Sequence, residues 1–462
     1  MKFADWRKTQ HFKGYKCVWQ ATEMFNAFLF SRKTSALMRR SRVSVVICGL
    51  SFIIDLCRIL RTAASMTEDK FSIMLVAGEA SGDAHAAKVV RALRRAAPET
   101  AFEFFGATGG QMREAGVETT VRADDLAIIG LPEIARALPM FWKTFQTLKA
   151  EAFRRQPNAV VLIDFPDFNL KLAKSLKKRG LKVVYYISPQ LWAWRKYRVK
   201  TVKNSIDLLL TILPFEKDWY AKRGIAHVEY VGNPLAKEVH SAMTKAEFCA
   251  EYNLEADKPI ISLLAGSRHK EIVKILPPLL ETAALMEEEN KNLQFVVALA
   301  PTRKLAEVEA AKTKAKNLPM NLTVVQNATR EAVHASDAAA VASGTATLET
   351  AILGTPLVVV YKTSALNYKL LRPLITVEHF GLINLIAGQR LAQELIQDDF
   401  TPETLSAELF RLLEPETNKK MRRRLREVTD TLGCGGAAQR AAEAILRELG
   451  AGAIRGKQNK KM

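Results

Sequence analysis

Cysteine is scarce in this chain of 462 residues. Its five cysteines, at positions 17, 48, 57, 249 and 434, form no Cys-x-x-Cys pair and no cluster with histidine. Zinc sites are normally built from such pairs and clusters. The sequence therefore argues against a zinc site and favours a protein that works in a reducing compartment.

Several common signatures of nucleotide and nucleic-acid binding are also missing. No loop has the Gly-x-Gly-x-x-Gly spacing of dinucleotide-binding proteins, and none ends in the Gly-Lys-Ser/Thr of ATPases. RNP, KH and zinc-binding patterns are absent, and no repeat with a period of about 20 to 50 residues occurs. These absences disfavour dinucleotide enzymes, P-loop ATPases and the usual nucleic-acid-binding modules.

Acidic residues are fewer than basic ones, 48 against 68, which gives a formal net charge of +20 and a pI near 9.7. Such an excess favours an anionic partner, whether a nucleic acid, a phosphorylated substrate or an acidic lipid surface. The first 65 residues alone carry +9, so the charge is concentrated toward the ends of the chain. Because no nucleic-acid motif accompanies it, we expect no nucleic-acid partner.

The N-terminal extension, residues 1–65, contains an apolar run at 43–54. A run of twelve residues falls short of the roughly 20 that span a bilayer, and Asp55 interrupts its continuation. About forty residues precede the run, which is too many for a signal peptide. The extension is an interfacial or poorly spanning anchor, a segment with another role, or a stretch outside a working protein that begins at Met66. We expect the last of these.

From Phe71 onward, short aliphatic runs alternate with amphipathic segments. Nine runs have the composition of buried strands; they span 72–78, 159–165, 182–188, 208–213, 259–266, 293–300, 322–327, 338–343 and 355–362. This alternation predicts an α/β protein with parallel sheets covered on both faces. The polar, helical stretch 230–259 separates two series of runs. We therefore predict two doubly wound, Rossmann-like domains facing across a cleft, with the functional residues on the loops after the strands.

Two loops of the first series carry carboxylates. In AGEASGD (77–83), Glu79 stands at a strand-to-helix turn, where it either serves a ligand site or is solvated beside an N-cap at Ser81 or Asp83. In IDFPDFN (163–169), Asp164 directly follows a strand and is either a general base or a turn residue.

Further details of these loops can be predicted from the same stretch of chain. We expect Asp167 to cap a helix that begins near Asn169. In SPQLWAWR (188–195), Trp192 and Trp194 either present aromatic faces to a sugar or phosphate, or pack between the domains.

The loop AGSRH (265–269) follows a strand of the second series. Gly266 would let the backbone approach a phosphate, Ser267 would hydrogen-bond to a phosphate oxygen, and Arg268 supplies a charged fork. A plain strand-to-helix turn is the alternative. Asn384, in the later motif NLIAG, either reads a base or sugar or bonds only to backbone.

The loop SGTATLE (343–349) is the most informative. Ser343, Gly344 and Thr345 present N–H and hydroxyl donors at a helix start, which suits a diphosphate. Glu349 follows about one turn later, where a carboxylate could accept hydrogen bonds from ribose hydroxyls. The combination favours a sugar nucleotide over a bare phosphate, although a plain turn remains the alternative.

A surface role is open for the helical stretch 132–155. It carries Phe141, Trp142 and Phe145 among several lysines and arginines. Bulky aromatics beside cations suit a membrane interface. Core packing with a solvated basic face is the equally plain alternative.

Eight motifs, taken in their order along the chain, resemble lipid-A-disaccharide synthases. They read AGEASGD, IDFPDFN, SPQLWAWR, ILPFEKDWY, VGNPLA, AGSRHKEI, ASGTATLE and NLIAG. The resemblance runs from about Ile73 to the helix near Leu449 and leaves residues 1–65 without a counterpart.

The resemblance implies a GT-B fold and an inverting glycosyltransferase at the cytoplasmic face of the inner membrane, in lipid A biosynthesis. Such enzymes join UDP-2,3-diacylglucosamine to 2,3-diacylglucosamine 1-phosphate through a β-1,6 bond and release UDP. It implies no metal or other cofactor, and a homodimer formed by C-terminal swapping. The implied parts are the extension 1–65, an acceptor domain at 66–235, a UDP-sugar domain at 236–425, and a C-terminal helix with a basic tail at 426–462.

The family's functional residues can be carried onto matching positions. Its catalytic carboxylate falls at Asp164, its essential arginine at Arg268 and its nucleotide-site asparagine at Asn384. Glu79 and Glu349 align with the acids of the first loop and of the SGT loop.

This chain departs from the family pattern at two places. Ala265 and Ile383 stand where the family usually has proline, and these changes alter backbone stiffness more than chemistry.

Two other functions share much of this pattern. A different GT-B enzyme acting on a UDP-sugar is one, although a peptidoglycan-type transferase would have a more glycine-rich first loop. A non-catalytic, membrane-associated protein that binds nucleotide sugars is the other, and it would not need Asp164.

Overall fold

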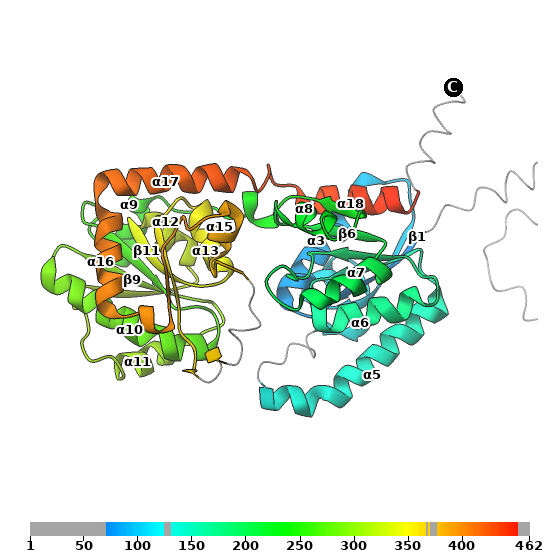
Figure 1. Ribbon diagram of the computed structural model, residues 1–462, viewed down its shortest axis with the longest axis horizontal. Helices are drawn as coiled ribbons and strands as arrows, with labels where there is room; N and C mark the ends of the chain where they lie inside the picture. Colours follow the sequence, from blue (N-terminus) through cyan, green and yellow to red (C-terminus); the bar gives the residue numbers. More distant parts are fainter. Residues whose placement is uncertain (1–70, 124–130, 366–367, 370–376, 451–462) are drawn as a thin grey trace, which may run out of the picture. The chain divides into compact units, whose positions relative to one another are not determined.

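The computed structural model describes residues 71–123, 131–365, 368–369 and 377–450, with backbone only for 131–137 (Figure 1). The predicted extension at 1–65 and the basic tail beyond residue 450 lie outside the described residues. Within the described part of the chain, no helix is both long enough and apolar enough to cross a bilayer.

The first sheet has seven parallel strands in the order β3-β2-β1-β4-β5-β6-β7. The strands are β1 (Phe71–Ala77), β2 (Phe102–Thr108), β3 (Glu118–Arg122), β4 (Ala159–Ile163), β5 (Val183–Tyr186), β6 (Leu208–Thr211) and β7 (Val228–Tyr230). The strand order reverses between β1 and β4, which are hydrogen-bonded neighbours. Ligands of open parallel sheets bind at such a switch point, so a ligand site is expected at the loops after β1 and β4.

Helices cover both faces of this sheet. They are α3 (Ala80–Ala96), α4 (Gly110–Glu114), α5 (Leu131–Arg155), α6 (Pro166–Lys177), η3 (Lys196–Arg198), α7 (Val199–Ser205) and α8 (Glu216–Ala221). Alternate residues of β1 enter two different cores: Leu75 packs in the core with α3, and Val76 packs in the core with α6. This alternation is the period of two that a strand imposes on a sheet buried on both faces.

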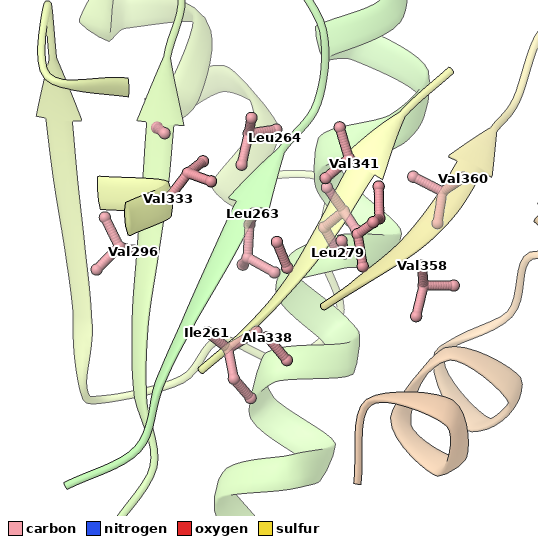
Figure 2. Packing of buried hydrophobic residues seen from close by; sticks show 14 of the residues in the cluster. Ile261, Leu263, Leu264, Leu279, Val296, Val333, Ala338, Val341, Val358 and Val360 are labelled. Carbon is pink, nitrogen blue, oxygen red and sulfur yellow. The ribbon is translucent and has the colours of Figure 1, made fainter. Parts of the chain in front are cut away.

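The second sheet has six parallel strands in the order β10-β9-β8-β11-β12-β13. They are β8 (Ile260–Leu264), β9 (Gln294–Leu299), β10 (Leu322–Gln326), β11 (Ala338–Ala342), β12 (Leu357–Tyr361) and β13 (Glu394–Ile396). Its switch point lies between β8 and β11, whose loops carry Arg268 and Ser343. Figure 2 shows the core of this sheet, where Leu263 of β8 and Val341 of β11 lie near Leu279 of α10.

The described residues of this second part form several long helices and two short 3-10 helices. They are η4 (Pro234–Lys237), α9 (Lys245–Tyr252), α10 (His269–Glu289), α11 (Leu305–Lys312), α12 (Thr329–Ala335), α13 (Thr345–Ile352), α15 (Leu382–Ala387), η6 (Gln397–Asp399), α16 (Pro402–Leu413) and α17 (Pro415–Asp430).

The last helix, α18 (Ala437–Glu448), returns to the first sheet and packs against α3 (Figure 1). Its buried face is rich in alanine, which lets the two helices approach closely, and Ile445 fills the same core. Two hydrogen bonds join this C-terminal segment to the first domain. Asn233 N–H donates to the Leu432 carbonyl (2.9 Å), and the Arg440 side-chain Nε donates to the Val231 carbonyl (2.8 Å). The C-terminus of the described chain is therefore part of the first domain's core.

All nine predicted strand runs are strands, so the predicted α/β class with two Rossmann-like sheets is confirmed. Four strands, β2, β3, β7 and β13, escaped prediction. Three of them have three to five residues and lie at or next to sheet edges, where little apolar patterning is required. The domain boundary near residues 235–236 remains a proposal, in a connection that runs from β7 to α9.

Candidate functional site

The turn after β4 presents Asp164. All five residues of β4 are buried, and the chain then turns through Asp164 and Phe165, whose φ angles of +46° and +51° are both left-handed. Helix α6 starts at once because Pro166 has the φ that the first helical position requires. The Asp164 carboxylate accepts from the backbone N–H of Phe165. The turn therefore presents a carboxylate at the switch point of the first sheet.

The environment of Asp164 makes it a stronger base than an ordinary aspartate. Burial raises the pKa of Asp164 to about 6, and the negative charge of Glu79 adds to this rise. The Phe165 N–H opposes it by stabilising the ionised form. A carboxylate that titrates near neutrality is suited to proton transfer at physiological pH.

Glu79 comes from the neighbouring strand end. It occupies the N-cap position of α3, but its side chain makes no capping hydrogen bond and is exposed. Gly78 precedes it, and a Cβ at that position would collide with the ring of Phe165. A glycine is therefore needed to let the loops after β1 and β4 lie against each other, which brings the two carboxylates into one region.

The other two acids of these motifs are structural. Asp83 is buried and accepts from the backbone N–H groups of Gly109 (2.8 Å), Gln111 (2.8 Å) and Met112 (3.2 Å), so it caps α4 rather than its own helix. Asp167 lies in the first turn of α6.

The prediction that Asp167 caps a helix beginning near Asn169 is wrong. Phe165 holds the N-cap position of α6, because Pro166 starts the helix three residues earlier than predicted. Asp167 instead forms ion pairs with Arg195 and Arg198, which tie α6 to the loop after β5.

The motifs SPQLWAWR and ILPFEKDWY form one hydrogen-bonded unit. The buried carboxylate of Glu216 accepts from the Ser188 hydroxyl (2.6 Å), from Trp192 Nε1 (3.0 Å) and from the Leu213 N–H (3.0 Å). Burial raises the pKa of Glu216 despite these donors. Trp192 therefore packs inside the first domain, whereas Trp194 is partly exposed and carries the Arg195 guanidinium 4.1 Å from its ring centre.

The AGSRH loop of the second sheet joins β8 to α10. Gly266 has a φ of +103°, and a Cβ there would collide with the Glu271 carboxylate. That carboxylate accepts from the backbone N–H groups of Ser267 (3.0 Å) and Arg268 (3.1 Å). The Arg268 side chain is 74% exposed and meets Glu271 at 3.2 Å. The exposed Ser267 side chain and the Arg268 guanidinium are thus the parts of this loop best placed for a ligand, because Glu271 already holds both N–H groups.

The SGT loop joins β11 to α13. Gly344 holds the N-cap position without a side-chain cap, and Thr345, the first helical residue, is exposed. The Ser343 hydroxyl donates to the Phe380 carbonyl (2.8 Å), so its predicted donation to a diphosphate would cost that bond. Glu349 lies one turn into the helix, 3.6 Å from the Arg330 guanidinium.

Asn384 of the NLIAG motif is fully buried in α15. Its amide nitrogen donates to the Ala392 carbonyl (2.7 Å) and to Glu394 (2.8 Å), and its oxygen accepts from the Leu391 and Ala392 N–H groups. Glu394 also accepts from Phe380 and Gly381. Of the two alternatives for Asn384, bonding within the protein is the one observed, although its partners include the Glu394 side chain as well as backbone groups. All four of its hydrogen-bonding positions are used, which leaves none for a direct contact with a nucleotide.

The three membrane-facing candidates differ in exposure. Phe141 and Phe145 are partly buried and place their rings against Phe165 and Phe168, at centroid distances of 6.3 and 5.9 Å. Trp142 is 65% exposed and stacks on Phe145. A row of aromatic rings therefore leads from the exposed Trp142 to the turn that carries Asp164.

Several residues that organise the site were missed from the sequence. They are Asn169 and Tyr185 beside Asp164, Glu216 beneath the SPQLWAWR loop, Arg330 beside Glu349, and Glu394 beside Asn384. Asn169 closes the motif IDFPDFN, so the motif itself offered a signal. Tyr185 and Glu216 lie more than 20 residues from Asp164 and Ser188, and Arg330 lies in a stretch without a motif, so only folding brings them to these partners. Glu394 is ten residues from Asn384.

Comparisons with known proteins identify the family of this chain. Residues 73–447 match the family model described as lipid-A-disaccharide synthetase. The chain is 42% identical over 375 residues to a lipid-A-disaccharide synthase of Trichlorobacter lovleyi, which covers 81% of this chain and 96% of the relative. Another, from Myxococcus xanthus, is 41% identical over 383 residues, or 83% of this chain and 98% of the relative.

Solved structures resemble the fold at low sequence identity. A UDP-GlcNAc 2-epimerase of Neisseria meningitidis matches with a TM-score of 0.53 at 12% identity, over 82% of this chain and 99% of that chain. The calicheamicin glycosyltransferase CalG4 matches with a TM-score of 0.52 at 14% identity, over 83% of this chain and 99% of that chain. These likenesses show the GT-B fold. By its family match and its close relatives, the chain belongs to the lipid-A-disaccharide synthase family and is a glycosyltransferase.

Proposed function

We propose that the protein joins UDP-2,3-diacylglucosamine to 2,3-diacylglucosamine 1-phosphate through a β-1,6 bond, with inversion at the anomeric carbon and release of UDP. The observation that carries this proposal is the turn after β4, which presents Asp164 with a pKa raised to about 6. Family membership supports the class of the two substrates.

In the proposed reaction, Asp164 accepts the proton of the acceptor's 6-hydroxyl. The bond from O6 to the donor's C1 forms while the bond from C1 to the diphosphate oxygen breaks, and its electron pair leaves with UDP. Because an alcohol is a far weaker acid than a carboxylic acid, proton transfer accompanies bond formation rather than preceding it. A pKa near 6 keeps Asp164 ionised at pH 7 and still makes it a better base than a solvated aspartate.

The departing UDP gathers negative charge, which we propose is offset from the second domain. The exposed guanidinium of Arg268 and the hydroxyl of Ser267 would contact the diphosphate, and the start of α13 at Gly344 and Thr345 would direct its N–H groups toward it. Gly266 would allow the close approach of the loop. The N–H groups at the start of α13 are held by the helix before the reaction, so they would lower the barrier without reorganising.

The remaining candidate residues would have different roles. Glu349 would accept from the ribose hydroxyls, oriented by Arg330. Ser343 and Asn384 make internal hydrogen bonds, so we propose that they hold the shape of the nucleotide loops. Glu79, whose charge contributes to the raised pKa of Asp164, would orient acceptor hydroxyls beside it.

We also propose peripheral attachment to the cytoplasmic face of the inner membrane. The exposed Trp142 would enter the lipid interface, supported from beneath by Phe141 and Phe145. Lys143 and Lys149 on the same helix would favour anionic lipid. A homodimer formed by C-terminal swapping is a further proposal from the family resemblance.

Asp164→Asn removes the proposed base while keeping the shape of the side chain. We expect turnover to fall by about 10²–10⁴-fold, while UDP binding is retained. The assay mixes purified protein with both glycolipids and follows UDP release and formation of a tetra-acylated disaccharide phosphate. Wild-type turnover should decline as pH falls through about 6. A fully active Asp164→Asn variant would refute the proposed base.

The same substitution should alter the pH dependence of folding stability. The pKa of Asp164 is raised in the folded state, so ionisation destabilises the fold as pH rises from about 4 to about 6. Asp164→Asn should therefore be more stable than wild type by about 1–3 kcal/mol at pH 7, and the difference should vanish below pH 4. Denaturant titrations across pH measure it. Equal stability at pH 7 would contradict the raised pKa.

Asp167→Asn is the matched control of opposite sign. Burial alone would raise the pKa of Asp167, but Arg198 and Arg195 outweigh it and lower the pKa. Its charge is therefore favourable, and its removal should destabilise the fold at pH 7.

Arg268→Ala should weaken UDP binding by roughly 10- to 100-fold and slow turnover together, since charge-assisted hydrogen bonds contribute about 1.5–3 kcal/mol. Calorimetric titration with UDP provides the affinity. Lys270→Ala, an exposed cation two residues further on, is the control and should leave UDP affinity unchanged. Equal losses in both variants would point to general charge rather than to Arg268.

Trp142→Ser should lower partitioning onto vesicles containing anionic phospholipid by roughly 10-fold, because burial of a large apolar side chain contributes about 1.5–3 kcal/mol. Co-sedimentation measures the bound fraction. Tyr197→Ser, which removes another exposed aromatic of the first domain, is the control and should bind like wild type. If Trp142→Ser also binds like wild type, this helix does not dock on lipid.

A further inference from the structure

The turn at Asp164 is a costly conformation. Two consecutive residues, Asp164 and Phe165, have left-handed φ angles, and neither is glycine. Each such residue costs on the order of 1–3 kcal/mol and persists only where the surroundings enforce it. Phenylalanine is especially unsuited to this region because its side chain is bulky. Something in the structure must therefore hold the turn.

The backbone of Asp164 is fully hydrogen-bonded. Its N–H donates to the Tyr186 carbonyl of β5 at 3.0 Å. Its carbonyl oxygen accepts twice, from the Asn169 side-chain nitrogen at 2.8 Å and from the Tyr185 hydroxyl at 2.6 Å. Both backbone groups of Asp164 are fixed, so its carboxylate is the group left to meet a substrate.

Asn169 is placed for this role. It is completely buried in α6, and its amide nitrogen also approaches the Ile163 carbonyl (3.2 Å) and the Val76 carbonyl (3.4 Å). One amide therefore joins the ends of β1 and β4, the strands whose loops carry Glu79 and Asp164. Its oxygen has no hydrogen-bond partner among the described residues, which is an expensive arrangement in a core. An amide kept at this cost indicates that its donors matter.

Tyr185 reaches the same carbonyl from β5. Its ring packs in the core with α6, and burial raises the pKa of its hydroxyl well above the usual value, so the group stays protonated and donates. The next residue, Tyr186, enters the opposite core with α3. Adjacent tyrosines thus have different surroundings, and only the first contacts the Asp164 turn through its hydroxyl.

We propose that Asn169 and Tyr185 are positioning residues that aim the Asp164 carboxylate by holding its carbonyl group. The inference rests on the proposed role of Asp164 as the base. Asn169 and Tyr185 need not touch substrate. Their two hydrogen bonds fix the left-handed turn, and the turn keeps the carboxylate in its buried orientation. Because burial is the main reason for the basicity of Asp164, a loosened turn would both misplace the carboxylate and make it a weaker base.

Tyr185→Phe removes one of the two donors and leaves the ring in place. We expect turnover to fall by roughly 10- to 100-fold, because a misplacement of about 1 Å can cost about 100-fold, with an unchanged KM for the UDP-sugar. The acid limb of the pH–rate profile should also move to lower pH, because a more solvated Asp164 titrates closer to an ordinary aspartate. Tyr186→Phe, the matched control on the same strand, should keep both wild-type turnover and the wild-type acid limb.

Asn169→Ser supplies an independent variant, since its shorter side chain does not reach the Asp164 carbonyl. It should show the same two changes, and a larger loss than Tyr185→Phe because it also releases the end of β1. Thermal unfolding of each folded variant separates positioning from stability. A loss of turnover that follows reduced stability while the acid limb stays in place would overturn the proposal.

The outcomes also distinguish this inference from the proposed function. If Asp164→Asn is inactive while Tyr185→Phe matches wild type in turnover and acid limb, the base stands and the positioning role falls. If Asp164→Asn is fully active, both fall. Support requires an inactive Asp164→Asn, a slowed Tyr185→Phe with a shifted acid limb, and an unaffected Tyr186→Phe.

Discussion

The hydrogen bonds at the carboxyl end of β4 are the constraint on which the proposed active site depends. The strand ends at the switch point of the first sheet, and the following turn has two left-handed residues. Asn169 and Tyr185 donate to the Asp164 carbonyl in this turn, and we propose that these two bonds hold it. The same buried amide reaches the end of β1. Gly78 completes the arrangement, because only a residue without a side chain leaves room for the Phe165 ring. The position and basicity of one carboxylate therefore follow from backbone geometry.

In the second domain, acidic side chains accept hydrogen bonds from the backbone of loops. Glu271 gathers the N–H groups of the AGSRH loop, and Glu394 gathers those near Phe380 together with the amide of Asn384. These carboxylates hold the loop after β8 and the start of α15 in place. The exposed guanidinium of Arg268 and the start of α13 are left facing outward. Such preorganisation is what stabilisation of a leaving group requires, because donors that are already fixed pay no cost during the reaction.

Much of the fold could be predicted from the sequence because buried parallel strands need uninterrupted aliphatic runs, as in AVVLI of β4. Short strands such as β13, with three residues, were not predicted because their hydrogen bonds to a neighbouring strand, rather than an apolar pattern in the sequence, define them. Within the candidate site, Asp164 and Arg268 could be chosen from the sequence because each lies in a loop motif that follows a predicted strand. The bonding of Asn384 and the ion pairs of Asp167 could not be predicted, since their partners are brought near by folding. Asn169 lies within the motif IDFPDFN, but its importance depends on the φ angles of a turn that residue spacing does not reveal.

We propose that Asp164 takes the proton from the acceptor hydroxyl, and a crystal structure of the protein with UDP and the acceptor glycolipid would test this role. We expect the Asp164 carboxylate to lie within about 2.6–3.2 Å of the acceptor's 6-oxygen, or one water away from it. An acceptor whose 6-hydroxyl faces a different side chain, with Asp164 out of reach, would exclude Asp164 as the base.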